Sequence, residues 1–322
     1  LDRFQREAVN AVESGRSVLV AAPTSSGKTV IAEAAIGQAL ESTQRTFYTA
    51  PIKALCNQKY RDLADLFGSD QVGLLTGDNS VAPRAQVVVM TTEVLRNMLY
   101  SEPSELDDLA WGILDEVHFL EDPYRGAVWE EVVLNLPDPV RIVALSATVS
   151  NASELGEWME SVRGTTEVVI ESRRPVPLQT YYLVAERQHG KRIRRLALTV
   201  EDRPNPEGQI FDLSAPHRGG GRRQVGRRNT RAGRWASPRR IEVAADLRRS
   251  GMLPVIHFVF SRKGCEEARD ARLRSGGDFN TAAEAQEVEE FVSRMLEHVE
   301  SQDLRALGAR RWTEGLGRSL WA

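Results

Sequence analysis

Residues 22–29 read APTSSGKT and nearly match the phosphate-binding pattern G-x-x-x-x-G-K-[ST]. Ala22 stands where the first glycine belongs. That glycine eases a turn, whereas phosphates are held by backbone N–H groups and by the N-terminus of the following helix, so alanine can replace it. The apolar run SVLVA at 17–21 and the helical pattern from Lys28 onward supply the strand and the helix that such a loop requires. We predict a nucleotide-binding loop; the alternative is a helix start with a serine-rich cap.

The residues of this loop have distinct expected roles. Gly27 allows the backbone to approach the phosphates, Lys28 brings a positive charge to the β- and γ-phosphates, and the Thr29 hydroxyl is a ligand for Mg²⁺. ATP and Mg²⁺ are therefore the expected cofactors. The predicted nucleotide-binding residues of the loop are Ala22, Pro23, Thr24, Ser25, Ser26, Gly27, Lys28 and Thr29.

A second motif, ILDEVHFL at 113–120, is an apolar strand that ends in two adjacent carboxylates. In enzymes with such a phosphate loop, one acid completes the Mg²⁺ shell and another residue positions or deprotonates the attacking water. Asp115 fits the first role and Glu116 the second. Because side chains alternate along a strand, the two carboxylates can face different partners. Taken alone, an acidic pair at a strand end is more often solvated surface; the loop at 22–29 favours catalysis by Asp115, Glu116 and Lys28.

Short apolar runs and helical patterns alternate over the first 170 residues or so, which predicts βαβ units in a doubly wound parallel sheet, an α/β fold of the P-loop NTPase kind. The runs are continuous rather than alternating, as expected when both faces of the sheet are covered. Strands are predicted at 17–22, 46–50, 72–75, 86–90, 111–114 and 141–146, and helices at 28–40, 53–67 and 126–136.

The pattern weakens after about residue 180. Residues 186–250 are rich in Arg, Gly and Pro and are interpreted as a linker or surface excursion. A strand is predicted at 254–260, with helical patterns at 262–273 and 282–308. The expected domains are therefore 1–180, an Arg/Gly-rich connection at 181–250, and an incomplete second domain at 251–322.

Composition excludes some classes and leaves one question open. The chain of 322 residues has 41% hydrophobic and 27% charged residues, a balance typical of soluble proteins, and it has no apolar run near the about 20 residues that span a bilayer. Cys56 and Cys265 lie far apart, so we expect free thiols in a reducing cytoplasm and no disulfide. Residues 214–240 contain many arginines and no acid. They either bind phosphates without sequence preference or form a solvated linker.

The order of motifs resembles superfamily 2 DExH-box helicases. The stretches at 22–29, 50–59, 90–99, 115–118 and 145–151 look like helicase motifs I, Ia, Ib, II and III. The longer phrase LDEVHFLEDPYRGAVWEEVV at 114–133 resembles the superkiller-type branch, which includes exosome-associated RNA helicases and the actinobacterial HelY proteins. RFQREAV at 3–9 resembles a Q motif, and HFVFSRKGCEEAR at 257–269 resembles motif IV. The resemblance implies a RecA-like domain followed by the start of a second one.

The resemblance also implies roles for individual residues. Gln5 would recognise adenine, with Phe4 packing nearby. The residues implied to contact the backbone of a single strand are Pro51, Lys53, Thr91, Thr92 and Glu93. The residues implied to couple the nucleotide state to that strand are His118, Ser146 and Thr148; for His118 a structural role at a strand end is the alternative.

The helicase motifs that supply arginine fingers in the second domain are missing from this sequence. RRQVGRRNTRAGR at 222–234 has the wrong spacing and precedes motif IV, so it is not one of them. We expect a cytoplasmic ATP-dependent RNA helicase that moves 3′ to 5′ on single-stranded RNA, with RNA-degrading nucleases as candidate partners and no membrane association. Two alternatives stay open: a DNA repair or recombination helicase, and a non-catalytic module that binds nucleotide and nucleic acid.

Overall fold

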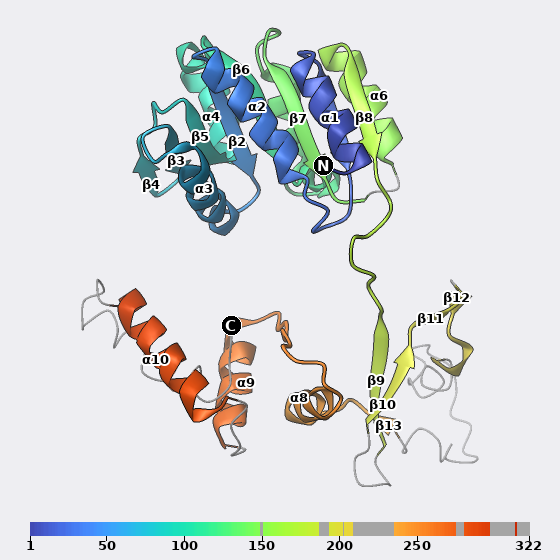
Figure 1. The fold of residues 1–322 in the computed structure, drawn as a ribbon. Coiled ribbons are helices and arrows are strands. Elements are labelled where there is room, and N and C mark those ends of the chain that lie inside the picture. The colour runs from blue at the N-terminus through green and yellow to red at the C-terminus, as the bar shows by residue number, and fades with distance from the viewer. Residues whose placement is uncertain are drawn as a thin grey trace, which may run out of the picture. The chain divides into compact units, whose positions relative to one another are not determined.

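The structure is a computed structural model that describes residues 1–148, 151–186, 193–201, 203–208, 235–274, 280–296 and 313. It divides into two compact units, Leu1–Leu178 and Gln179–Ala322, and each is described by itself (Figure 1). Within the described ranges, no helix is long and apolar enough to cross a membrane.

Unit 1 is built on an eight-stranded sheet with the order β4-β3-β5-β2-β6-β7-β1-β8. All neighbouring strands are parallel except β4, which pairs antiparallel with β3 at one edge. The predicted α/β sheet is confirmed, as a mixed sheet with one antiparallel edge strand. The strands are β1 (Ser17–Ala21), β2 (Arg45–Ala50), β3 (Val72–Thr76), β4 (Asn79–Val81), β5 (Val87–Thr91), β6 (Leu109–Asp115), β7 (Arg141–Ser146) and β8 (Thr166–Ile170).

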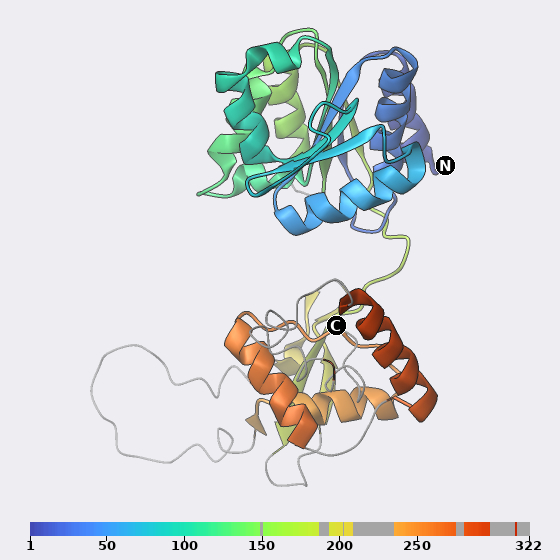
Figure 2. The same ribbon diagram turned by 90° about the vertical axis from the view of Figure 1, so that its left-hand side faces the viewer.

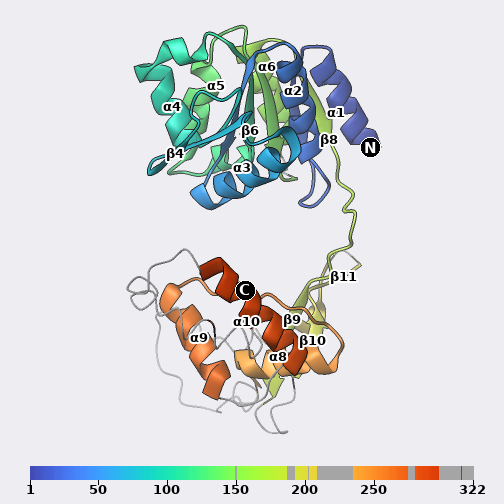
Figure 3. The same cartoon turned by 60° about the vertical axis from the view of Figure 1, so that its left-hand side comes forward.

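Helices cover both faces of this sheet (Figures 1 and 2). Alternation along β1 shows how: Val18 and Val20 pack with α1, α2 and α3, whereas Leu19 packs with α4, α5 and α6 on the other face. Figure 3 shows the two groups of helices from another side. Their bounds are α1 (Arg3–Glu13), α2 (Thr29–Glu41), α3 (Lys53–Phe67), α4 (Thr92–Ser101), α5 (Gly126–Asn135) and α6 (Ala152–Arg163), with 3-10 turns η1 (Pro103–Leu106) and η2 (Val117–Glu121).

Unit 2 contains more regular structure than the sequence pattern indicated. A small antiparallel sheet has the order β10-β9-β13, and β11 pairs with β12. The described part of 181–250 therefore contains strands and a helix, and its interpretation as a connection between domains stays a prediction. The elements are β9 (Tyr181–Glu186), β10 (Ile193–Ala197), β11 (Thr199–Val200), β12 (Arg203–Pro204), η3 (Pro206–Gly208), β13 (Trp235–Ala236), α8 (Arg240–Arg249), α9 (Arg262–Arg274) and α10 (Ala282–Leu296).

Two sequence predictions in unit 2 need comment. The strand predicted at 254–260 is wrong: the segment has no strand structure, and Phe258 and Phe260 are 80% and 105% exposed. A strand needs a neighbour for its backbone hydrogen bonds, and none of the described segments supplies one here. The Arg-rich stretch falls largely outside the described residues, as do 297–308 of the predicted C-terminal helix.

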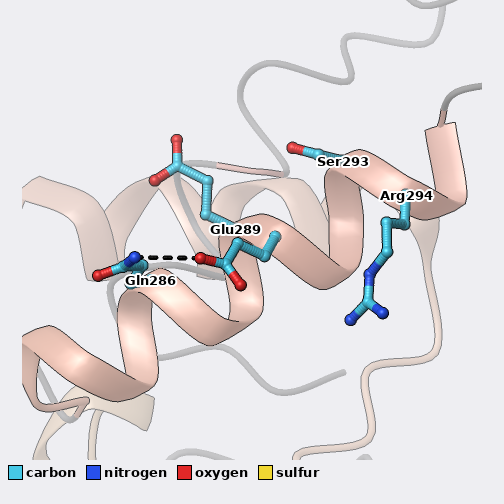
Figure 4. A pocket seen from close by; sticks show the side chains of 5 residues that line it. Gln286, Glu289, Ser293 and Arg294 are labelled. Carbon is cyan, nitrogen blue, oxygen red and sulfur yellow. Dashed lines mark hydrogen bonds between the residues drawn. The ribbon is translucent and has the colours of Figure 1, made fainter.

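A surface hollow of about 610 Å³ lies along α10. Figure 4 shows the side chains that line it projecting from this one helix, with a hydrogen bond of 3.0 Å between Gln286 and Glu290. Its lining residues are Gln286, Glu289, Glu290, Ser293 and Arg294, none of which belongs to the predicted nucleotide site.

Candidate nucleotide site

The predicted site residues follow the carboxyl ends of neighbouring strands in unit 1. In the register of the sheet, Asp115 at the end of β6 pairs with Leu145 of β7, and Ser146 pairs with Ala21 at the end of β1. The loop at 22–28 and the acidic pair therefore both lie at the carboxyl ends of the strands, and β7 lies between the two strands that carry them. Open α/β sheets bind their ligands at this end of the strands.

The loop has the strained backbone of a close-fitting turn. Ser25 and Gly27 have positive φ angles of 66° and 80°. A Cβ added to Gly27 would lie 2.7 Å from Gln5 Nε2, so this position has no room for a side chain unless Gln5 moves. Ser26 is buried, and its Oγ has no hydrogen-bond partner among the described residues. A buried hydroxyl without a partner in such a loop fits a phosphate oxygen as its ligand.

Lys28 lies against the loop that precedes it. Its Nζ donates to the carbonyl oxygens of Ala22 and Pro23 at 2.8 and 3.1 Å. Burial lowers the pKa of Lys28, and the carboxylates of Glu116 and Asp115 act in the opposite direction. The charge of Lys28 is thus held beside both acids, where it can meet an anionic ligand.

Asp115 is held by two hydrogen bonds. Its Oδ2 accepts from the Tyr48 hydroxyl at 2.5 Å, and its Oδ1 accepts from the backbone N–H of Glu116 at 3.0 Å. Burial, followed by the neighbouring Asp115, raises the pKa of Tyr48 well above 10.0, so the phenol stays protonated and remains a donor. Sequence reasoning did not predict Tyr48 as part of this site.

Glu116 has the properties of a base in a strained setting. Its φ of 57° is left-handed, which costs a non-glycine residue on the order of 1–3 kcal/mol and is frequent at functional sites. Burial and then Asp115 raise the pKa of Glu116, against the charges of His118, Lys28 and Lys59. A carboxylate with a raised pKa accepts a proton from water more readily than an ordinary one.

His118 lies in η2 beside the acidic pair. Its Nδ1 is 3.3 Å from Glu116 Oε2 and 3.5 Å from the backbone nitrogen of Ala147. The Ala147 N–H donates to Nδ1, so His118 contacts both the Glu116 carboxylate and the backbone that follows β7. Ser146 is buried and its Oγ has no partner within the described part of the chain, whereas Thr148 is exposed.

Gln5 connects the first helix to the loop. Its Nε2 donates to the carbonyl oxygens of Ser26 and Gly27 at 3.2 and 3.1 Å, and its Oε1 accepts from the Asp2 backbone at 2.7 Å. Phe4 is 4% exposed and packs into the core on the α1–α3 face. The structure thus places Gln5 beside the phosphate loop and Phe4 in the core; recognition of adenine stays a prediction.

Comparison with known proteins gives the family. The model of the DEAD/DEAH box helicases matches residues 2–155. This part of the chain is a DEAD/DEAH box helicase domain. The predicted resemblance to superkiller-type helicases is confirmed as well, by relatives that align with nearly the whole chain.

Three relatives illustrate that resemblance. The probable helicase HelY of Mycobacterium tuberculosis (strain ATCC 25618 / H37Rv) is 47% identical over 326 residues, which cover 100% of this chain and 36% of that protein. Superkiller complex protein 2 of Homo sapiens is 39% identical over 337 residues, covering 99% and 26%. The exosome RNA helicase MTR4 of Homo sapiens is 40% identical over 306 residues, covering 94% and 28%. The chain spans about a third or less of the length of these relatives.

The residues predicted to contact a nucleic acid strand lie at the same edge of the helicase sheet. Pro51 is buried directly after β2, and exposed Lys53 begins α3 with its Nζ 2.8 Å from Asp78 Oδ1. Thr91 ends β5, followed in α4 by buried Thr92 and by Glu93. This placement is compatible with a single nucleic acid strand that crosses the carboxyl ends of the β-strands.

The donor set also fits Mg²⁺. The described residues hold no cluster of three or more His, Cys, Asp or Glu side chains that could bind a metal by themselves. Mg²⁺ in NTPases is typically held by one or two protein oxygens together with substrate phosphates and water. The Thr29 hydroxyl and the Asp115 carboxylate are oxygen donors of that kind. Lys59 lies close to this donor set: its Nζ is 3.0 Å from Thr29 Oγ1 and 6.0 Å from the centre of the Tyr48 ring.

Proposed function

We propose that this chain is the nucleotide-hydrolysing part of a superkiller-type RNA helicase, which couples ATP hydrolysis to 3′-to-5′ movement along single-stranded RNA. One observation carries the proposal: the phosphate loop with Lys28 and Thr29 and the acidic pair Asp115 and Glu116 meet at one sheet edge. Their charges act on one another, because both acids affect the pKa of Lys28. A solvated surface pair would not be coupled to a partly buried loop lysine in this way.

The residues divide the work of hydrolysis. Mg²⁺, when bound, neutralises charge on the triphosphate. Thr29 and Asp115 would hold the metal, and Lys28 would exchange its loop carbonyls for phosphate oxygens. Glu116 would orient the attacking water and take its proton, and His118 Nδ1 lies beside its carboxylate. Because His118 also lies near Ala147 at the end of β7, a change at Glu116 reaches the segment after that strand.

The test separates binding from hydrolysis. Glu116→Gln keeps the shape of the side chain but removes the base. We expect that this variant of the full-length protein binds a fluorescent ATP analogue as the wild type does, while RNA-stimulated phosphate release falls by about 10²-fold or more. Lys28→Ala should lose nucleotide binding itself. Undiminished turnover in Glu116→Gln would contradict the assigned mechanism.

RNA is favoured over DNA as the track because two of the relatives named above are described as an RNA helicase or a superkiller protein. Contacts from backbone-binding residues such as Lys53 and Thr91 would not read base sequence. Comparing ATPase stimulation by single-stranded RNA and DNA of one sequence decides between the two. A larger stimulation by DNA would favour a DNA repair or recombination helicase.

We also propose that residues 1–322 by themselves bind nucleotide but do not unwind. Stimulated phosphoryl transfer in comparable NTPases relies on an arginine finger, worth about 10³–10⁵ in rate. Rapid unwinding by this chain alone would contradict that expectation.

A further inference from the structure

Lys59 is a second lysine at the nucleotide site, and the roles described above leave it unused. It lies on α3, the next helix along the chain after the one that follows the phosphate loop, and its side chain is partly buried. Its Nζ donates to Thr29 Oγ1 at 3.0 Å. It also lies 6.0 Å from the centre of the Tyr48 ring, at the outer limit of a cation–π contact. The ammonium is thus fixed between Thr29 and the phenol that holds Asp115.

The acceptor of this hydrogen bond is the oxygen predicted to bind Mg²⁺. A Mg²⁺ ligand lies at about 2.0–2.1 Å from the metal, so a metal on Thr29 Oγ1 would be at most about 5 Å from an ammonium on the same oxygen. A hydroxyl has two lone pairs, but two cations this close repel each other. Lys59 and a divalent cation therefore compete for Thr29.

Lys28 does not relieve this competition. Its Nζ is turned to the carbonyl oxygens of Ala22 and Pro23, so the two lysines hold different parts of the site. Lys59 has a flexible stem of four carbons and three donors, which suits it to move from a neutral hydroxyl to an anionic phosphate oxygen. The phosphates of a nucleotide would both attract the ammonium and complete the metal shell.

We propose that Lys59 is a positioning residue that occupies the Thr29 hydroxyl and so makes divalent-cation binding depend on the nucleotide. The cation alone binds weakly because Lys59 stays on Thr29, and it binds tightly with the nucleotide because the phosphates draw the ammonium away. This inference rests on the proposed nucleotide site and adds to it a residue that sets the order of binding.

The test measures metal binding rather than activity. Mn²⁺ is the probe, and its free fraction is followed by electron paramagnetic resonance in titrations of the full 322-residue chain, without nucleotide and with saturating ADP. The variants are Lys59→Met, which keeps the stem and removes the charge, and Lys59→Arg, which keeps the charge. Lys263→Met, an exposed position on α9 in unit 2, is the matched control.

Without nucleotide, Lys59→Met should bind Mn²⁺ about tenfold more tightly than the wild type, because even with the screening of bulk water one charge about 5 Å from a divalent ion changes its affinity by that order. Lys59→Arg and Lys263→Met should match the wild type. With ADP, the advantage of Lys59→Met should largely disappear. A general loss of structure would weaken binding in Lys59→Met rather than strengthen it.

Equal or weaker Mn²⁺ binding by Lys59→Met would overturn the proposal. ADP affinity is measured in the same samples with a fluorescent analogue, so that failure of the proposed role of Lys59 can be told from failure of the proposed nucleotide site. If the wild type binds ADP while Lys59→Met shows no gain in Mn²⁺ affinity, the role of Lys59 is wrong and the nucleotide site stands. If the wild type does not bind ADP, both fall together.

Discussion

Replacing Tyr48 by phenylalanine removes one oxygen atom from the core and tests how Asp115 is held. Tyr48 is fully buried, and its hydroxyl donates to Asp115 Oδ2 at 2.5 Å. Phenylalanine fills the same volume, so no cavity forms. A hydrogen bond to a charged group contributes about 1.5–3 kcal/mol. Since Asp115 is only partly buried and water can replace the lost donor, we expect the lower end, a loss of about 1.5 kcal/mol in the free energy of unfolding.

The metal site should respond more strongly than the fold. Partners that orient a metal ligand typically contribute about 10–100-fold in metal affinity. We therefore expect Tyr48→Phe to weaken Mn²⁺ binding in the presence of ADP by at least about tenfold, measured by electron paramagnetic resonance. Tyr100→Phe is the matched control, because its hydroxyl also donates to a carboxylate, that of Glu131 at 3.3 Å, but on an exposed surface.

The same variant has a defined pH dependence. The pKa of Tyr48 in the folded protein lies well above its ordinary 10.0, chiefly because of burial. The folded state therefore favours the protonated phenol, and this contribution to stability is complete below about pH 10 and is lost as the pH rises toward the folded pKa. The free energy of unfolding, followed by circular dichroism, should therefore fall less steeply above about pH 10 in Tyr48→Phe than in the wild type. If both tyrosine variants behave alike in the metal and alkaline titrations, the hydrogen bond to Asp115 does not orient the ligand.

Two further predictions use glycine and cysteine positions. Gly27→Ala should lower the free energy of unfolding by about 1–2 kcal/mol and weaken ADP binding, because an L-residue is strained at φ 80° and its Cβ displaces Gln5. Urea unfolding and ADP titration measure the two effects. Gly77→Ala is the control, because the space around Gly77 is open. Cys56 should react with a thiol reagent only on unfolding, because it is fully buried and burial raises its pKa to about 11. The less buried Cys265 should react in the folded protein. Peptide mapping of the labelled thiols checks this, and equal labelling of the two cysteines would contradict it.

The fold of unit 1 follows closely from its sequence, because its apolar runs are continuous and helical patterns separate most of them. The helix predicted at 53–67 has those bounds in the structure, and the six predicted strands are all present. β4 was not predicted, since its three residues are exposed and form no apolar run. At 254–260 the apolar run misleads, because an apolar run becomes a strand only where another strand can pair with it.

Some residues of the candidate site could be predicted from local sequence motifs, whereas others depend on contacts between distant parts of the chain. The loop, Asp115 and Glu116 belong to short motifs and could be predicted from spacing. The left-handed backbone of Glu116 could not, because nothing in the residue type indicates it. Tyr48 depends on the register between β2 and β6. It pairs with Ile113, and since side chains alternate, Asp115 two residues later lies on the same face of the sheet.

Lys59 shows why register and helix placement matter for function. In the sequence it lies 30 residues after Thr29, at the end of a stretch whose expected role is strand contact. Its contact with Thr29 exists because α2, which begins at Thr29, packs against β2, and because α3 follows β2 directly. The helix that begins at Lys53 in the proposed nucleic acid contact therefore also reaches the proposed metal ligand. If binding of an RNA strand shifts α3, Lys59 would transmit that shift to Thr29. Lys59→Met should therefore reduce the effect of RNA on Mn²⁺ affinity. An undiminished effect in this variant would show that the coupling runs through His118 or another route.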